Sequence, residues 1–209
     1  MPHTLTEPAR QTPIWGEYDV VVLGGGPAGI AAAVAASRAG RSTLLIERYG
    51  FLGGMGTAAG VTNFCGLHAN VHGNIRQVVH GVADDLLQRI DHLGGLNTPH
   101  NLFGKTVAQA YDTAAYKIAA DDLLANAGVQ VLFHALAAGV VMASPRTVHA
   151  LLIETKSGRR AVVGSEHQGG RLDQQHQQHR QARPKVCRRL PGGKAPPAGC
   201  TDERKRTVA

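Results

Sequence analysis

Residues 18–47, YDVVVLGGGPAGIAAAVAASRAGRSTLLIE, decide the fold of this chain of 209 residues. The stretch opens on a short β-branched, apolar run, residues 19–23, which is typical of a buried parallel strand. A Gly-x-Gly-x-x-Gly turn follows, then an alanine-rich helical segment and a second apolar strand that ends at Glu47. This order of strand, glycine turn, helix, strand and acid predicts a β-α-β unit.

The three glycines of the turn have separate tasks. Gly24 allows the tight turn, Gly26 lets a pyrophosphate approach the backbone, and Gly29 lets the helix pack closely on the sheet. The start of the helix offers unpaired N–H groups and the positive end of the helix dipole, which suit a diphosphate. Glu47 follows at the distance where a carboxylate can accept hydrogen bonds from an adenosine ribose. We therefore predict a dinucleotide site, the alternative being an ordinary glycine-rich turn of an α/β protein.

The composition allows a packed core and argues against a membrane protein. Hydrophobic residues make up 43% of the chain, yet no run approaches the length of a membrane span without charges or helix breakers. Residues 1–17 contain prolines and acids and lack the apolar region of a signal peptide, so we expect a flexible arm and a cytoplasmic protein. The cysteines form neither a disulfide framework nor a paired metal motif; they are Cys65, Cys187 and Cys200.

The formal net charge of +7 is concentrated at the C-terminal end of the chain. Residues 164–209 hold ten Lys and Arg against four Asp and Glu, which leaves the rest of the chain nearly neutral. This segment lacks apolar periodicity and is predicted to be disordered, because it cannot bury enough surface to offset its ordering entropy. It also lacks aromatic residues that could stack on bases, so nucleic acid is not an expected partner.

The middle of the chain predicts a ligand-wrapping loop and a helix. Residues 48–67 are rich in glycine and leave the carboxyl end of the second strand, where open α/β sheets bind ligands. Residues 74–93 carry apolar side chains every three to four positions, which predicts a helix that Gly94 and Gly95 end. Nearby histidines match no zinc-binding spacing, and no metal site is expected; they are His68, His72, His80 and His92.

The second half predicts one more helix and four strands. Asp112 can cap a helix over residues 113–127, and Gly128 can end it. Residues 129–133 read as the next buried strand. Three further strand-like runs are separated by turns and predict an antiparallel meander; they are residues 138–143, 147–154 and 160–163.

Two segments outside the first unit carry a resemblance to a known family. They are ERYGFLGGMGTAAGV, residues 47–61, and YDTAAYKIAADDLLANAGVQVLFHALAAGVV, residues 111–141. With the β-α-β unit they resemble the FAD-dependent oxidoreductases of the glutathione-reductase-like superfamily, in particular the bacterial group related to heterodisulfide reductase. The resemblance covers residues 18–163 and implies a Rossmann-like FAD-binding domain with a meander insertion, in which the flavin carries the redox chemistry.

The resemblance also implies a role for each matching position. The residues it assigns to FAD are Gly24, Gly26, Pro27, Ala28 and Gly29 at the pyrophosphate, Glu47 with Arg48 beside it at the adenosine ribose, Gly53, Gly54, Met55 and Thr57 on the flavin side, and the backbone of Leu136 or Ala137 at the adenine. Cys65 is the one candidate redox residue, the alternative being a small apolar side chain packed in the loop. Some relatives carry an iron–sulfur cluster, but a single loop cysteine cannot supply four thiolates.

The sequence departs from the family after residue 163. The family continues into a buried strand and a second FAD contact, whereas this chain passes into the polar segment 164–209. We interpret the chain as the N-terminal, cofactor-binding part of such an enzyme, with a truncated or frameshifted reading frame as the hypothesis for residues 164–209. Reading the other two frames of the DNA tests it, because the hypothesis requires the apolar continuation in one of them.

Two other functions stay open at this point. Glu47 is compatible with NAD as well as FAD, so the chain can be a fragment of an NAD-dependent dehydrogenase. It can also be a non-catalytic binding module whose basic C-terminal segment meets an acidic partner. The glycine-rich loop and the meander favour FAD. The residues that would choose a substrate are not recognisable in the sequence.

Overall fold

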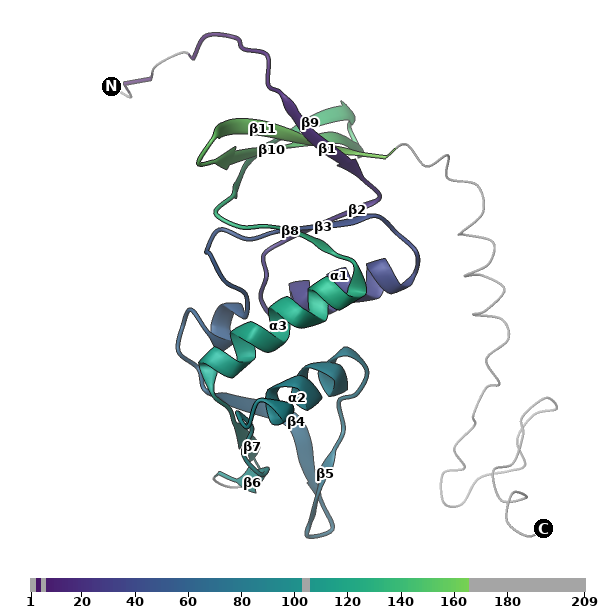
Figure 1. Cartoon of the computed structure of the whole chain (residues 1–209). Coiled ribbons are helices and arrows are strands. Elements are labelled where there is room, and N and C mark those ends of the chain that lie inside the picture. The colour runs from purple at the N-terminus through teal and green to yellow at the C-terminus, as the bar shows by residue number, and fades with distance from the viewer. Residues whose placement is uncertain (1–2, 5–6, 103–105, 166–209) are drawn as a thin grey trace, which may run out of the picture. The chain divides into compact units, whose positions relative to one another are not determined.

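The computed structural model describes residues 3–4, 7–102 and 106–165, and a parallel sheet lies between an antiparallel sheet and a layer of helices (Figure 1). Three strands form this sheet in the order β2-β3-β8: β2 (Val20–Leu23), β3 (Thr43–Ile46) and β8 (Gln130–Leu132). Both pairings are parallel. Helix α1 (Pro27–Arg38) links β2 to β3, so the predicted β-α-β unit is confirmed.

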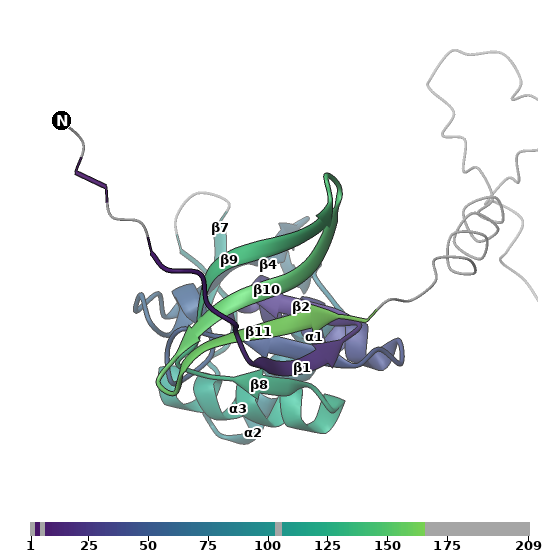
Figure 2. The same ribbon diagram turned by 90° about the horizontal axis from the view of Figure 1, so that it is seen from above.

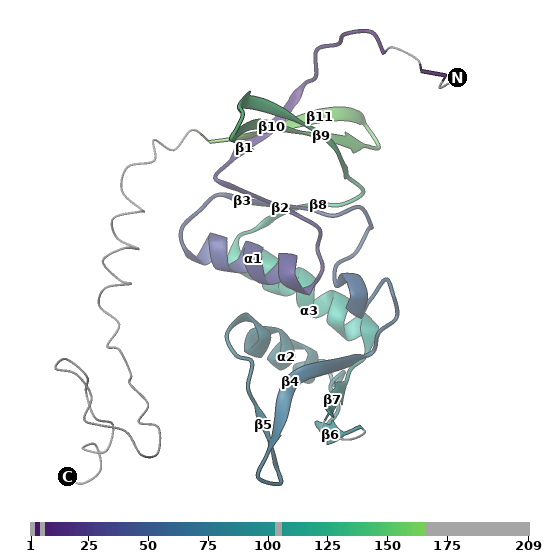
Figure 3. The same ribbon diagram turned by 180° about the vertical axis from the view of Figure 1, so that it is seen from behind.

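Two helices cover one face of the parallel sheet. Figure 3 shows α1 beside α3 (Thr113–Ala127), which leads into β8. The predicted ends of α3 are confirmed, because the Asp112 carboxylate accepts a hydrogen bond from the Ala115 N–H at 2.7 Å and Gly128 ends the helix with φ of +77°. The core on this side includes fully buried Ile30, Val34, Leu45, Tyr116 and Leu124.

An antiparallel meander covers the other face. It consists of β9 (Leu136–Ser144), β10 (Thr147–Thr155) and β11 (Gly158–Gly164), as predicted. A second apolar cluster lies between the meander and the parallel sheet, with Tyr18, Leu44, Ile46, Ala135, Ile153 and Val162. The predicted fold class, a parallel β-α-β core with a meander, is therefore confirmed. The predicted disorder of residues 164–209 falls almost wholly outside the described residues.

The predicted flexible arm is wrong at its C-terminal end. Strand β1 (Ile14–Tyr18) pairs in parallel with β11 at the edge of the meander (Figure 2). Backbone hydrogen bonds continue on either side, from Ala161 N–H to Pro13 O at 2.9 Å and from Ser165 N–H to Tyr18 O at 3.0 Å. The chain then crosses from the meander to the parallel sheet at Asp19, between β1 and β2.

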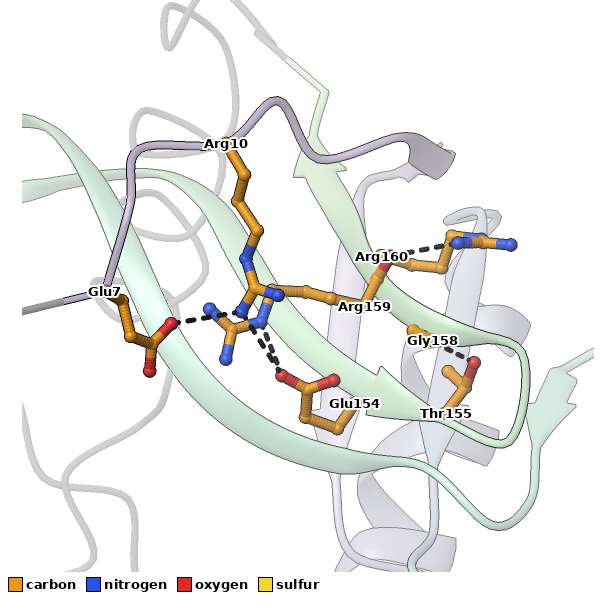
Figure 4. A network of polar contacts seen from close by, with 7 residues as sticks. All are labelled: Glu7, Arg10, Glu154, Thr155, Gly158, Arg159 and Arg160. Atoms are coloured by element: carbon orange, nitrogen blue, oxygen red, sulfur yellow. Dashed lines mark hydrogen bonds and ion pairs between the residues drawn. The ribbon is translucent and has the colours of Figure 1, made fainter.

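A polar network lies where the N-terminal segment crosses the meander (Figure 4). The Glu154 carboxylate faces Arg159 at 2.5 Å and Arg10 at 4.0 Å, and Arg10 also lies 3.5 Å from Glu7. Glu7, Arg10 and Glu154 are at least 41% exposed and Arg159 is 26% exposed, and ion pairs that solvent reaches contribute little to stability. The backbone pairing of β1, rather than this network, anchors the segment.

The predicted helix over residues 74–93 is also wrong in its first half. Helix α2 (Val82–His92) starts later, and residues 74–77 form β5 (Asn74–Gln77), which pairs antiparallel with β4 (Asn63–Val71). His72 and Gly73 connect them with φ of +50° and +86°, as a two-residue hairpin turn with positive φ at both positions requires. The expected loop 48–67 is therefore shorter, because β4 begins at Asn63.

A third sheet thus lies beyond the helices, in the order β5-β4-β7-β6. Its remaining strands are β6 (His100–Asn101) and β7 (Thr106–Ala110). Figure 1 shows α2 between this sheet and the pair α1 and α3. None of the helices in the described ranges is long and apolar enough to cross a bilayer.

Two tyrosines in the helical core differ in how their hydroxyls are satisfied. The rings of Tyr111 and Tyr116 meet edge to face at 5.2 Å. The Tyr111 hydroxyl contacts the Gly56 carbonyl oxygen at 3.1 Å and also that of Val61. The fully buried Tyr116 hydroxyl has no hydrogen-bond partner among the described residues. Burial, together with the neighbouring Tyr111, raises the pKa of Tyr116 to about 12, so its hydroxyl is neutral at physiological pH.

We expect Tyr116→Phe to stabilise the protein by about 1 kcal/mol, because a buried hydroxyl without a partner loses its hydration and gains nothing. For a chain of this size the Tm rises by about 2–4 °C. Tyr111→Phe is the matched control and lowers the Tm, since it removes a hydroxyl that is hydrogen-bonded. Thermal unfolding followed by circular dichroism measures both. A lower Tm for Tyr116→Phe contradicts the unpartnered assignment.

Candidate dinucleotide-binding site

The glycine turn after β2 is fixed by close backbone contacts. Gly24 has φ of +95°, and its N–H donates to Ile46 O at 2.8 Å, which ties the turn to the end of β3. A Cβ on Gly29 would lie 1.8 Å from the Gly24 carbonyl oxygen. No side chain fits there, so α1 can approach β2 this closely only with glycine at position 29.

The start of α1 has no side chain among the described residues that caps its N–H groups. Gly26 is the N-cap and offers no side-chain cap, Pro27 occupies the first turn, and that turn holds no acidic residue. The N–H groups of Ala28 and Gly29 lie in the first turn, where no intrahelical acceptor is available. A Cβ on Gly26 would find nothing closer than Gly54 Cα at 3.9 Å, so the space beside Gly26 is open. An anion suits this position.

A second glycine turn packs against the first one, backbone to backbone. Gly53 N–H donates to Gly25 O at 2.8 Å, and a Cβ on Gly54 would lie 2.9 Å from Gly26 Cα. Both Gly53 and Gly54 have positive φ, at +106° and +49°, and a short 3₁₀ turn, η1 (Gly54–Gly56), follows. The two turns form one backbone cradle at the N-terminus of α1.

Thr57 and Met55 take different positions after this second turn. The buried Thr57 hydroxyl donates to Leu52 O at 2.6 Å and so holds the loop closed on itself. Met55 is 64% exposed and points away from the core. Of these two residues, expected together on the flavin side, Thr57 stabilises the loop and Met55 presents an apolar surface.

Glu47 joins the two turns to the end of β3. Its carboxylate is only 6% exposed and accepts hydrogen bonds from Gly25 N–H at 2.6 Å and from Tyr49 N–H at 2.9 Å. Each carboxylate oxygen has a second lone pair, so Glu47 can still accept a ribose hydroxyl. The sequence located this acid correctly at the strand end but did not reveal its contacts with the glycine turn.

Two aromatic side chains follow Glu47, an exposed Tyr49 and a partly buried Phe51. The Arg48 guanidinium lies 4.5 Å from the centre of the Tyr49 ring and donates to its hydroxyl. Tyr49 stacks on Phe51 at 5.6 Å, and Lys117 Nζ lies 3.9 Å above Phe51. The ring faces and these two cations form a mixed surface beside the cradle.

Leu136 and Ala137 lie in β9, two positions earlier than the predicted start of the meander. Both are exposed. The preceding residue binds the Glu47 segment, because Ala135 N–H donates to Glu47 O at 3.1 Å. The backbone of Leu136 is therefore held near the end of β3, where the adenine was expected.

Cys65 does not lie in a loop and is not packed. It occupies β4 opposite Ala108, and its side chain is exposed. The expected loop position is therefore wrong, as is the alternative of a packed side chain, whereas the redox role of Cys65 stays a prediction. Cys65 is the only cysteine within the described ranges, which hold no group of three His, Cys, Asp or Glu side chains able to bind a metal. Cys187 and Cys200 lie outside them.

The cradle, the uncapped helix and the strand-end acid together define a dinucleotide-binding protein of the α/β class. The family model described as FAD dependent oxidoreductase matches residues 19–166, and the chain belongs to this family. The match covers most of the chain and agrees with the family predicted from the sequence. The more specific resemblance to the heterodisulfide reductase group stays a prediction.

Curated relatives match over short segments only. Dihydrolipoyl dehydrogenase of Trypanosoma brucei brucei is 52% identical over 45 residues, which are 22% of this chain and 9% of the relative. Thioredoxin reductase of Bacillus subtilis (strain 168) is 51% identical over 53 residues, 25% of this chain and 16% of the relative. The open form of a flavocytochrome c3 fumarate reductase has a TM-score of 0.50 at 17% identity, covering 72% of this chain and 33% of that one. That likeness shows the fold alone.

Proposed function

We propose that the chain binds FAD at the cradle and is the cofactor-binding part of an oxidoreductase. The observation that carries this proposal is the backbone contact between the two glycine turns at the uncapped start of α1. Such a cradle suits a diphosphate, and Glu47 suits the adenosine ribose beside it. The family to which the chain belongs supports FAD over NAD.

The proposed roles follow the positions of the residues. The N–H groups of Gly26, Ala28 and Gly29 bind the diphosphate, with Gly24 and Pro27 fixing the turn. Glu47 orients the ribose, and Arg48 lies beside it. Gly53, Gly54, Met55 and Thr57 form the wall on the flavin side, and the backbone at Leu136 and Ala137 faces the adenine. FAD, when bound, supplies the redox chemistry, and these residues supply its position.

The proposed domain boundaries are a cofactor-binding domain at residues 18–163, to which β1 adds residues 14–17, with a preceding segment and a following segment 164–209. The curated matches span at most 16% of the relatives' length, so the activity of the whole enzyme is part of the proposal. We expect weak FAD retention, because β2 has no strand partner on its outer edge within the described residues. Stoichiometric, tightly bound flavin in the purified chain contradicts this expectation.

Gly26→Ala tests the site itself. The new Cβ meets no protein atom closer than 3.9 Å, so we expect the Tm to change little. It occupies the space where the diphosphate approaches the backbone, so FAD binding weakens by at least about tenfold, as the loss of one or two charge-assisted hydrogen bonds implies. Titration with FAD, followed by flavin fluorescence, measures the affinity. A titration with NAD tests the dehydrogenase alternative, which predicts that NAD binds more tightly than FAD.

The control is Gly164→Ala, because a Cβ at Gly164 also meets open space but lies at the end of β11. Its FAD affinity equals that of the unmodified chain. The proposal fails if Gly26→Ala and Gly164→Ala bind FAD equally well.

A further inference from the structure

We propose a second ligand site on this domain, a cavity between α2 and the third sheet that binds a small organic cation bearing an ammonium group. The cavity has a volume of about 480 Å³, which lies within the range of small-molecule sites. Its lining comes from β4, β5, α2, β7 and residues 96–99. None of the residues assigned to FAD lines it.

A buried amide in the cavity wall has an acceptor without a partner. The Gln109 side chain is part of a residue only 6% exposed, and its Nε2 donates to Asn97 O at 2.9 Å. This bond identifies which amide atom is the nitrogen and which is the oxygen, because exchanging them would set two acceptors against each other. Gln109 Oε1 then has no donor among the described residues. A buried acceptor of this kind requires a donor, and the terminal torsion of glutamine is soft enough to present it to a ligand.

The charges of the lining determine the sign of the ligand. Two carboxylates, Asp84 and Asp91, face the cavity, and no Lys or Arg of the described residues lines it. Asp84 already accepts from Gly81 N–H at 2.8 Å and from Gln77 Nε2 at 2.5 Å. The Asp91 carboxylate has no hydrogen bond or ion pair within the described ranges, so a negative charge at the cavity is left without a counterion.

Nearby histidines do not offset the negative charge of the cavity lining. Burial lowers the pKa of His68, the histidine in the lining, which keeps its ring neutral at physiological pH. His80, which contacts Asp84 at 3.2 Å, lies outside the lining. Leu87 and Leu96 add apolar surface that suits an alkyl chain. The combination of an unsatisfied acceptor, an unpaired carboxylate and apolar wall selects an alkylammonium and rejects anions such as phosphate.

Titration with butylammonium tests the site on the full chain by NMR chemical shifts. Butanol and butyrate, which have the same alkyl chain, separate the charge from the apolar contact. We expect butylammonium to bind saturably and the other two to bind at least about tenfold more weakly, as a charge-assisted hydrogen bond implies. Equal binding of butanol overturns the proposal and assigns the cavity to water or to apolar solutes. The titration needs no flavin, so its outcome is independent of the proposed function.

Two variants locate the binding. Asp91→Asn removes the unpaired charge and is expected to weaken butylammonium binding several-fold and to reduce its dependence on salt. Gln109→Met removes the acceptor at nearly the same volume and weakens it by about tenfold. Asp121→Asn, an equal charge change at an exposed site on α3 outside the cavity, leaves it unchanged. Because Asp91 is exposed, its variant folds even if Gln109→Met does not, and unchanged binding in Asp91→Asn overturns the proposal.

Discussion

Gly29→Ala is expected to destabilise the domain by more than about 3 kcal/mol, the upper range for forcing extra volume into a packed site. The Cβ would lie 1.8 Å from the Gly24 carbonyl oxygen and 3.4 Å from Val22 Cγ1. The first of these atoms is backbone, so no rotamer change relieves the clash. Relief requires α1 to move away from β2, and this movement opens the core around Ile30 and Val34.

Urea unfolding measures this loss of stability, and two other glycine-to-alanine variants serve as controls. Gly26→Ala adds the same methyl group three residues earlier, where the nearest atom is 3.9 Å away, and Gly164→Ala adds it in open space. Both are expected to unfold at nearly the urea concentration of the unmodified chain. If Gly29→Ala unfolds there too, the close packing of α1 on the glycine turn is wrong.

The contrast between Gly29 and Gly26 separates two reasons for glycine in one motif. Gly29 is required by the fold, because a backbone oxygen already occupies the place of its side chain. Gly26 faces open space, so the protein alone gives no reason for glycine there. The sequence motif predicted a packing role for Gly29 and a ligand role for Gly26. The distances support the packing role of Gly29, whereas the ligand role of Gly26 stays a prediction.

Local sequence patterns predicted the helices and strands around the proposed FAD site well. The β-α-β unit, the capped helix α3 and the meander each depend on neighbouring residues, such as Asp112 at a helix start and Gly128 at its end. The Glu47 position followed from the motif, but its hydrogen bond to Gly25 joins residues 22 positions apart. Such a contact depends on how the strands pair, which a local pattern does not record.

The wrong predictions, the flexible arm and the helix over residues 74–93, also come from contacts that a local pattern does not record. Strand β1 is short and exposed on most of its residues, and it is held by β11, a partner about 150 positions away in the chain. Residues 74–93 carry apolar side chains at helical spacing, yet Gly81 with φ of +86° separates the strand β5 from α2. The signal that sequence reasoning missed is the pair His72-Gly73, which suits a two-residue hairpin turn.

Glu47→Gln is expected to lower the stability by about 2 kcal/mol, the contribution of a hydrogen bond to a charged group. The change keeps the size of the side chain but replaces one acceptor oxygen with an NH₂ group. Either Gly25 N–H or Tyr49 N–H then loses its acceptor in a site that is nearly inaccessible to water. For a chain of this size the Tm falls by about 4–8 °C.

Glu154→Gln is the matched control, because it makes the same chemical change at a half-exposed carboxylate. Glu154 pairs with Arg159 and Arg10 on the meander, and exposed pairs of this kind contribute less than about 1 kcal/mol. We therefore expect Glu47→Gln to lower the Tm clearly more than Glu154→Gln does. Since Glu47 also links the glycine turn to β3, its variant should weaken FAD binding as well, whereas Glu154→Gln should not. Equal effects of the two variants on Tm would show that Glu47 does not hold the turn, and the cradle would then depend on backbone contacts alone.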